Sequence, residues 1–510
     1  MYSISLLASS LVCLLGALPA HAADTGTWPW QTYKSSPMEP PSLKVTKSGP
    51  TSPGYLFFDQ NGSGAHNYSL FIMTDDNELI WQSPYGDLSA YRAQMFDGKP
   101  VLTYFNGVAF SEPFGFGLGI IQVLDDSYES IYNVTIENAG FVTMPEVSVA
   151  EIVSWIDIHE ALVTPQGTML VTAVNVTQTD LTSVGGPEDG WIADSLFYEI
   201  DIKSNEVLFQ WNSLDHADQV PLSNALTFYP LEDLGRNQSY PWGPFHINSV
   251  EKFQDGSYLV SSRYYSSLFK IALDGTVDWT LEGKTGGDFE LGPGLSFSYQ
   301  HDARIHHEGN NTVLISIHNN ANSAIVSGKE QTTGLFMELN TQTWKAMLTR
   351  KLFDPADPVY AVSQGGLQLL DDQHTIMGYG STPKIKEYSP NGSCVMTAQF
   401  GPSSTVQSYR AFRLPWVGRP KTAPDAFACV DQVSNKTLVY MSWNGATEHR
   451  SWNVYAGKSQ ESLHLAGHAK KTGFETVTAI GGSPSYIRVE AEGLNITSGV
   501  SSMISPQDSC

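Results

Sequence analysis

The chain is poor in cysteine and in positive charge. Its 510 residues include 4 Cys, and 28 Lys and Arg stand against 52 Asp and Glu, which gives a formal net charge of -24. An acidic surface repels the phosphates of nucleic acids and anionic membranes, so neither is an expected partner. Beyond the first residues no apolar run reaches the length of a membrane span, so we expect no membrane insertion. The 41% of hydrophobic residues predicts a soluble globular protein with a large core.

The sequence also lacks the local signatures of several common enzyme classes. It contains no GxSxG, no Walker loop and no HExxH, and the glycine-rich segment 115–119 does not open a helix. The histidines could ligate a metal, but they come with Arg263 and Arg304. Cations beside such a cluster favour an anionic or oxygen-rich ligand, so no metal site is expected.

The first residues that carry a signal are at the N-terminus. An apolar run over 4–18 ends in Ala20-His21-Ala22, a small-x-small pattern, and predicts a signal peptide over residues 1–22, although the segment before the run has no Lys or Arg. Nine Asn-x-Ser/Thr sequons follow and predict a secreted or lumenal glycoprotein. They start at Asn61, Asn67, Asn133, Asn175, Asn237, Asn310, Asn391, Asn435 and Asn495.

Cysteine usage agrees with an oxidising compartment. Cys13 leaves with the leader, so the mature chain keeps an odd number of cysteines. We expect one disulfide, between Cys394 and Cys429, and a free thiol at Cys510.

One unit recurs through most of the chain. Residues 23–53, rich in Pro, Ser and Thr, are expected to form an irregular arm. From residue 54 to 510, an apolar strand, an Asp/Asn/Gly turn and a second strand recur, as at 70–81, 121–128, 197–211 and 268–279. Strands repeating at roughly 50 to 75 residues predict an all-β, six-bladed β-propeller in a single domain, with one blade closed by strands from both ends of the chain. A sandwich or two barrels is the alternative, but the repeat leaves no linker.

The stretch from Gly243 to Arg263 carries the first candidate site residues. Alternation along a strand places His246 and Asn248 on one face, and an Asp-Gly turn brings the cation of Arg263 back to the same end. In a propeller, polar residues at matching points of the innermost strands meet in the central channel.

Matching positions in other units supply more polar residues. His159, His301 and His318 stand at such points; each alone is more often a structural histidine, but together they predict a site. His301 beside Asp302 is the candidate nucleophile or general base, because a carboxylate next to an imidazole fixes its tautomer. The candidate substrate-binding residues are Asp302, Arg304, His318, Gln364, Trp242 and Phe245.

Several motifs resemble those of fungal arylsulfotransferase-like proteins over nearly the whole mature chain. They include Asp157-Ile158-His159-Glu160, residues 245–250 (FHINSV), residues 299–304 (YQHDAR) and residues 408–413 (SYRAFR). The resemblance implies a six-bladed propeller. It also implies that His301 takes sulfate from an aryl ester as a covalent intermediate without a nucleotide donor, while His159, His246, Asn248 and Arg263 bind the sulfuryl oxygens.

Departures from that family favour a second chemistry. Members carry Arg and Gly where this chain has Thr280 and Glu282, and Asp where it has His318. If these positions face the channel, less positive charge is available for a sulfate ester. Similar propellers act as cofactor-independent hetero-Diels-Alderases, which hold a quinone-methide-type tropolone or phenol against a terpene alkene. Trp242 and Phe245 would belong to an aromatic wall; core packing is the alternative for each.

These observations lead to one preferred function and two alternatives. The preferred hypothesis is a cyclase that needs no cofactor and acts on an aromatic secondary metabolite. Nucleotide-independent sulfuryl transfer is the alternative, and a non-catalytic binding propeller is the third. A monomer is expected in each case.

Overall fold

The computed structural model describes residues 28–110, 115–137, 140–145, 147, 152–324, 330–494 and 499–510. The expected signal peptide and the sequon at Asn495 lie outside these residues. The described chain is built from strands, with short 3-10 helices at η2 (Thr182–Val184), η3 (Leu214–His216), η4 (Leu222–Ala225) and η5 (Gln460–Ser462). The all-β prediction is therefore confirmed.

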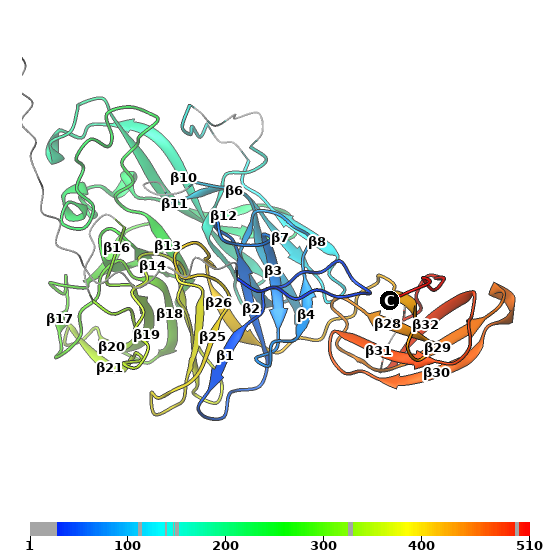
Figure 1. The fold of residues 1–510 in the computed structure, drawn as a ribbon. Helices are drawn as coiled ribbons and strands as arrows, with labels where there is room; N and C mark the ends of the chain where they lie inside the picture. Colours follow the sequence, from blue (N-terminus) through cyan, green and yellow to red (C-terminus); the bar gives the residue numbers. More distant parts are fainter. Residues whose placement is uncertain are drawn as a thin grey trace, which may run out of the picture.

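Six groups of four antiparallel strands make up most of the molecule (Figure 1). The first comprises β26 (Ala411–Leu414), β2 (Tyr55–Gln60), β3 (Ser69–Met73) and β4 (Leu79–Gln82). The second comprises β5 (Leu88–Phe96), β6 (Lys99–Ala109), β7 (Gly117–Leu124) and β8 (Ser130–Val134). The third comprises β9 (Ile156–Val163), β10 (Thr168–Thr179), β11 (Gly190–Asp201) and β12 (Val207–Asn212), and pairs with the second through Gly119 and Ile156.

The remaining three groups follow in chain order. The fourth comprises β13 (Ile247–Lys252), β14 (Tyr258–Ser262), β15 (Ser267–Ile271) and β16 (Val277–Glu282). The fifth comprises β18 (His301–Glu308), β19 (Thr312–Asn319), β20 (Thr333–Asn340) and β21 (Lys345–Leu352), with β17 (Glu290–Leu291) at its edge. The sixth comprises β22 (Gly366–Leu369), β23 (Thr375–Gly378), β24 (Lys384–Tyr388) and β25 (Cys394–Gln399), with β1 (Lys44–Lys47) at its edge.

The groups follow one another in a closed order. Strand β13 contacts β9 and β18, β5 contacts β9 and β26, and β22 contacts β18 and β26. A hydrophobic cluster joins each group to the next and the sixth to the first; for example, Leu170 and Phe197 pack with Val260 and Phe269. As expected, β26 from late in the chain pairs with β2 and completes the first group. These six inner strands (β26, β5, β9, β13, β18 and β22) therefore lie beside one another.

The predicted hairpin of the stretch 243–263 is present. Strands β13 and β14 pair with Lys252 opposite Tyr258. Between them Gly256 has φ of 91°, which glycine adopts without strain, and the Asp255 carboxylate accepts from the backbone N of Ser257 at 2.9 Å.

The last sheets form a separate body at the right of Figure 1. One sheet comprises β27 (Asp425–Asp431), β28 (Lys436–Ser442) and β31 (Glu475–Ile480), and the other β30 (His464–Lys470), β29 (His449–Gly457) and β32 (Tyr486–Gly493). They enclose a core of their own, with Val439, Trp452 and Val489 fully buried. A single domain over 54–510 stays a prediction.

The arm over 28–53 is largely irregular apart from β1 and links the two parts. Its Ser35 backbone N donates to the Glu475 carboxylate at 2.6 Å, and Tyr33 packs on Phe474 at 4.5 Å between ring centroids. Figure 1 shows the arm, in dark blue, reaching towards the C-terminal body.

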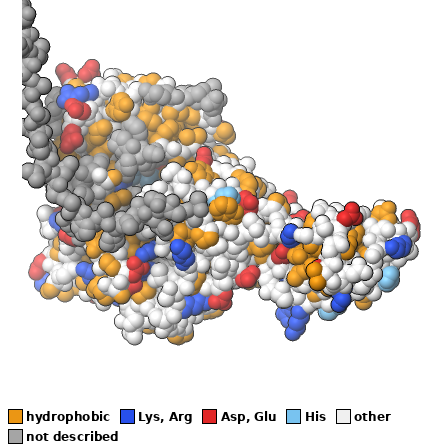
Figure 2. Space-filling model, in the orientation of Figure 1, with side chains coloured by type: hydrophobic (Ala, Val, Ile, Leu, Met, Phe, Trp, Pro, Cys, Tyr) orange, Lys and Arg blue, Asp and Glu red, His pale blue; other side chains and the backbone are white. Residues whose placement is uncertain are grey.

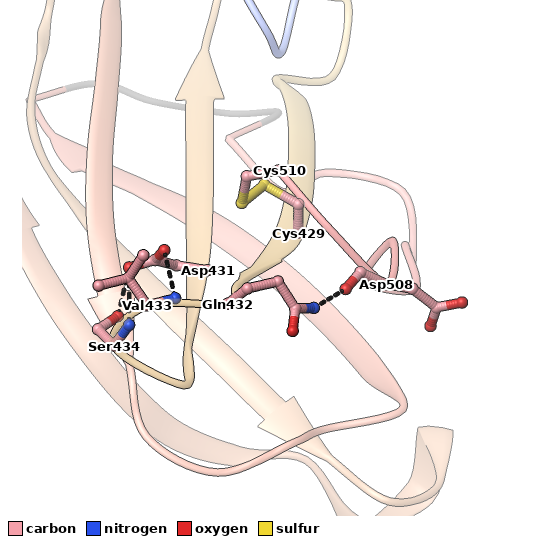
Figure 3. The surroundings of a disulfide bond; sticks show 7 residues. All are labelled: Cys429, Asp431, Gln432, Val433, Ser434, Asp508 and Cys510. Carbon is pink, nitrogen blue, oxygen red and sulfur yellow. Dashed lines mark hydrogen bonds between the residues drawn. A yellow bond between two sulfur atoms is a disulfide. The ribbon is translucent and has the colours of Figure 1, made fainter.

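The predicted disulfide pairing is wrong. The bridge joins Cys429 to Cys510, and Cys394 is the free thiol (Figure 3). Cys394 lies on β25, in another sheet from Cys429 on β27, whereas the chain end returns along β27, with the Gln507 N donating to the Ala428 carbonyl at 2.9 Å. A disulfide is consistent with a secreted or lumenal protein.

The surface carries charged side chains of both signs. Acidic and basic side chains are interspersed on the face in Figure 2. Among the described residues, no helix has the length and apolar character of a membrane span.

Candidate active site

The inner strands are irregular at the end where the candidate histidines lie. Strand pairing shifts register between Ser89 and Arg92, between Ile247 and Ser249, and between His301 and Arg304. Non-glycine residues with positive φ stand at the same points: Ala90 (51°), His246 (42°), Asp302 (55°) and Gln364 (61°). Bulges of this kind re-aim side chains beside active sites, and they also break the alternation that the sequence analysis assumed.

His159 and His246 form a hydrogen-bonded pair. The Nδ1 of His159 lies 2.5 Å from the Asp157 carboxylate, and its Nε2 lies 3.1 Å from the Nε2 of His246. Because a carboxylate only accepts, the proton of His159 stands on Nδ1, and in the neutral pair His246 donates to His159. Asp157 is itself held by the Gly117 N at 2.7 Å and the Thr172 hydroxyl at 3.0 Å.

A small cavity adjoins this pair. Its volume is about 10 Å³, and its lining includes Phe116, Asp157, His159, Ser195 and His246. Such a volume suits a single water-sized group. It marks the place where the His159–His246 pair can be reached by a small polar group.

His301 has a fixed tautomer, but its partner is not the predicted one. Its Nδ1 donates to Asn320 Oδ1 at 2.7 Å, and its Nε2 accepts from the Gln364 backbone N at 3.2 Å. The Asn320 amide is oriented by its own donation to the Gln364 carbonyl at 2.9 Å. The lone pair therefore stands on Nε2, which suits a nucleophile. Asp302 points towards Arg304 instead, because strand pairing shifts register between His301 and Arg304.

Arg263 lies close to both His246 and His301. Burial lowers the pKa of His246 well below its usual value, helped by the charges of His159 and Arg263, and burial also lowers the pKa of His301, with Arg263 the next cause. Arg263 donates to the Tyr264 hydroxyl and to the Val362 carbonyl, both at 3.0 Å. The two imidazoles are neutral near a guanidinium.

His318 completes this group. It pairs across the strands with His301, is fully buried, and has no hydrogen-bond partner for either ring nitrogen among the described residues. Burial lowers its pKa to about 4. We call His159, His246, His301, His318 and Arg263 the histidine cluster.

Asn248 and Gln364 both contact the chain around His301, and their contacts with a substrate stay a prediction. The Asn248 amide donates to the Gln300 carbonyl at 2.7 Å and so holds the chain just before His301. Gln364 contributes its backbone N–H to His301, while its side chain donates to Gln407 at 3.2 Å.

Asp302 and Arg304 belong to a buried ion-pair network. Arg304 contacts Asp302 at 2.6 Å and Glu160 at 2.7 Å, and Arg410 contacts Glu160 at 3.0 Å. The two guanidinium charges keep the pKa values of both carboxyls below their usual range despite burial. We call Glu160, Asp302, Arg304 and Arg410 the ion-pair network.

The sequence analysis assigned no role to Asn320 and missed the network roles of Glu160 and Arg410. Glu160 and Arg410 stand in the quoted motifs beside His159 and Ala411, so a search for charged residues at matching inner-strand positions could have found them. No local signal pointed to Asn320, which follows β19 and reaches His301 only through the fold.

Trp242 and Phe245 lie in the hydrophobic core, as the alternative interpretation had it. Trp242 is fully buried and donates to the Tyr229 carbonyl at 3.1 Å, and Phe245 packs on Trp211 and Phe269. Neither lines the cavity described above.

No cluster of three or more His, Cys, Asp or Glu in the described residues is arranged to hold a metal ion.

The chain matches the model of one protein family. The model described as Arylsulfotransferase (ASST) matches residues 92–401, which is more than half of the chain. The chain belongs to this family. The matched range carries the whole histidine cluster and ends before the C-terminal body. None of the curated proteins compared with the chain matches it.

Solved structures give only distant likenesses. A protein of unknown function from Bacteroides caccae is 16% identical, with 71% of this chain and 100% of that chain covered and a TM-score of 0.38. A GH43 protein from Bacillus licheniformis is 9% identical (82% and 88% covered, TM-score 0.32). The virginiamycin B lyase from Staphylococcus aureus with quinupristin is 9% identical (88% and 96% covered, TM-score 0.29). TM-scores below 0.5 do not establish a shared fold.

Proposed function

We propose that the protein is a sulfotransferase-type enzyme that moves a sulfuryl group from an aryl sulfate ester to a phenol through His301. The observation that carries the proposal is His301 itself: a neutral imidazole with its lone pair fixed on Nε2, beside Arg263 and the His159–His246 pair. The family match over the residues that build this cluster supports the same chemistry.

The geometry suggests how the first step proceeds. The Nε2 of His301 attacks sulfur, the bond from sulfur to the aryl oxygen breaks, and the phenolate leaves with the electron pair. His301 then carries the sulfuryl group on Nε2 and its proton on Nδ1, where the Asn320 carbonyl accepts it at 2.7 Å. Arg263 supplies donors for the sulfuryl oxygens. The two N–H groups of the neutral His159–His246 pair are already donated to Asp157 and to His159. The substrate displaces the single Gln364 N–H from Nε2.

The second step restores the enzyme. The acceptor phenol gives its proton to the His159–His246 pair as its oxygen attacks sulfur, and the bond from sulfur to His301 breaks. Asp157 stabilises a protonated His159 through the 2.5 Å contact. After the second step the pair releases this proton to solvent, where it balances the phenolate released in the first step.

Two of the three departures that favoured cyclisation, Thr280 and Glu282, lie away from the histidine cluster, whereas the third, His318, belongs to it. Thr280 and Glu282 are on β16, three strands from β13, and the Glu282 carboxylate accepts from the Lys284 N at 2.9 Å in its own turn. Thr280 and Glu282 therefore do not reduce the positive charge that is available beside His301 and Arg263. No observation favours the hetero-Diels-Alderase, whose expected wall residues Trp242 and Phe245 are core.

The proposed setting is a six-bladed propeller in a secreted, monomeric glycoprotein. Six four-stranded groups in closed order support the blade count, and the disulfide supports the compartment.

The test is release of nitrophenol from p-nitrophenyl sulfate in the presence of a phenol. We expect wild-type protein to release nitrophenol and to sulfate the phenol, and His301→Ala to lose at least about 10³-fold in rate. His307→Ala is the matched control, because His307 lies on the same strand but is exposed. Absence of transfer by the wild type with several aryl sulfates, or full activity in His301→Ala, would overturn the proposal.

A further inference from the structure

Arg92 is a cation beside the ion-pair network that lacks a counter-ion. It lies on the inner strand β5, and its pKa is lowered to about 10, first by burial and then by the charge of Arg304. Its guanidinium forms no hydrogen bond or ion pair within the described residues, and its Nη1 is buried. Its guanidinium carbon lies 4.9 Å from the centroid of the Phe412 ring.

The network has no charge to spare for Arg92. Arg304 and Arg410 are each paired with both Glu160 and Asp302, so two cations already balance two anions. Glu251 interacts electrostatically with Arg92 but forms no ion pair with it in the described structure, and its carboxyl accepts from the Ile305 N at 2.7 Å. An unpaired buried charge is costly, so an additional anion beside Arg92 would stabilise the fold.

Solvent can reach part of this guanidinium. Arg92 as a residue is half-buried although Nη1 itself is covered. A planar guanidinium with unused N–H donors suits a small oxyanion or halide. We propose that Arg92 holds a small inorganic anion, chloride or sulfate, beside the ion-pair network. This site is independent of sulfuryl transfer at His301.

The first experiment measures thermal unfolding of the full chain. Chloride, or in a second arm sulfate, replaces gluconate at constant ionic strength. We expect the Tm of the wild type to rise by roughly 2–4 °C at saturating anion, because ligand bound only to the folded state stabilises it. Arg92→Met should lose this rise. The arm with the larger rise identifies the anion.

Arg419→Met is the control. Arg419 is an exposed arginine whose guanidinium already pairs with the Asp126 carboxylate at 2.6 Å, so it needs no further anion. Its rise should equal that of the wild type. An equal rise in Arg92→Met, or no rise in the wild type, overturns the proposal.

A second measurement needs no variant. A crystal of the wild type soaked in bromide should give an anomalous peak within hydrogen-bond reach of the Arg92 guanidinium. If Arg92→Met fails to fold, this peak, or tetrahedral density from sulfate, carries the proposal. Absence of both overturns it.

Discussion

The histidine cluster and the ion-pair network are adjacent in sequence but differ in electrostatics. His159 is followed by Glu160, and His301 by Asp302, yet each pair divides between the two groups. In the cluster, burial keeps imidazoles neutral with hydrogen-bonding capacity left over, as at His318. In the network, each carboxylate is shared by two guanidinium groups. The difference indicates that the histidine cluster is the reactive layer and the ion-pair network a rigid, charge-balanced structural layer beside it.

The largest effect on stability should come from breaking the network. Asp302→Asn leaves Arg304 and Arg410 with a reduced counter-charge, which we expect to cost about 3–5 kcal/mol of unfolding free energy. His301→Ala should cost far less while abolishing transfer. Denaturant unfolding measures both. Equal destabilisation by the two variants would contradict the division into reactive and structural layers.

The next effect is on catalysis and tests the positioning role of Asn320. Asn320→Ala removes the acceptor that fixes the His301 tautomer, so we expect kcat to fall about 10²-fold with stability changed by only about 1 kcal/mol. Asn320→Asp should restore part of the activity, because a carboxylate also accepts from Nδ1, and should shift the pH profile upward. Unchanged kcat in Asn320→Ala would remove Asn320 from the mechanism.

Acid pH should separate the two layers. The folded pKa of His318 is lowered to about 4 from an ordinary value near 6.5, so its contribution to stability is full above pH 6.5 and is lost as pH falls towards 4. The network carboxyls, with pKa values below the usual range, resist acid further. His318→Leu should therefore reduce the loss of unfolding free energy between pH 6.5 and 4.5 by about 2 kcal/mol.

The test compares the pH dependence of the unfolding free energy in the wild type with that in His318→Leu. Asp59 and Asp194, whose pKa values burial raises to about 7, act oppositely over the same pH range and are common to both proteins. Identical pH dependence of His318→Leu and the wild type would show that His318 is not the buried neutral group described here.

Much of the fold and of the histidine cluster could be predicted from the strand period and the positions of the motifs. The predictions that failed concern local contacts. The recurring hairpins, the all-β class and the gathering of His159, His246 and His301 follow from strands repeated along the chain. It could not be predicted that Asn320, and not Asp302, contacts His301, because this depends on a bulge at the start of β18. The disulfide was missed because its pairing depends on where the last residues return along β27.

The smallest expected effect concerns the sequons, far from both layers. Asn133, Asn237, Asn310, Asn391 and Asn435 are exposed and should carry glycans if the chain is secreted from a eukaryotic cell. Asn61 should not in the folded protein, because its Nδ2 donates to the buried Asp59 carboxyl at 2.9 Å. Peptide mapping after deglycosylation in heavy-oxygen water measures occupancy site by site. Because these five asparagines do not line the cavity beside His159, removal of their glycans should leave transfer rates within about twofold and change stability by less than about 1 kcal/mol. Full occupancy at Asn61 would mean that the seam between β2 and β26 forms only after glycosylation.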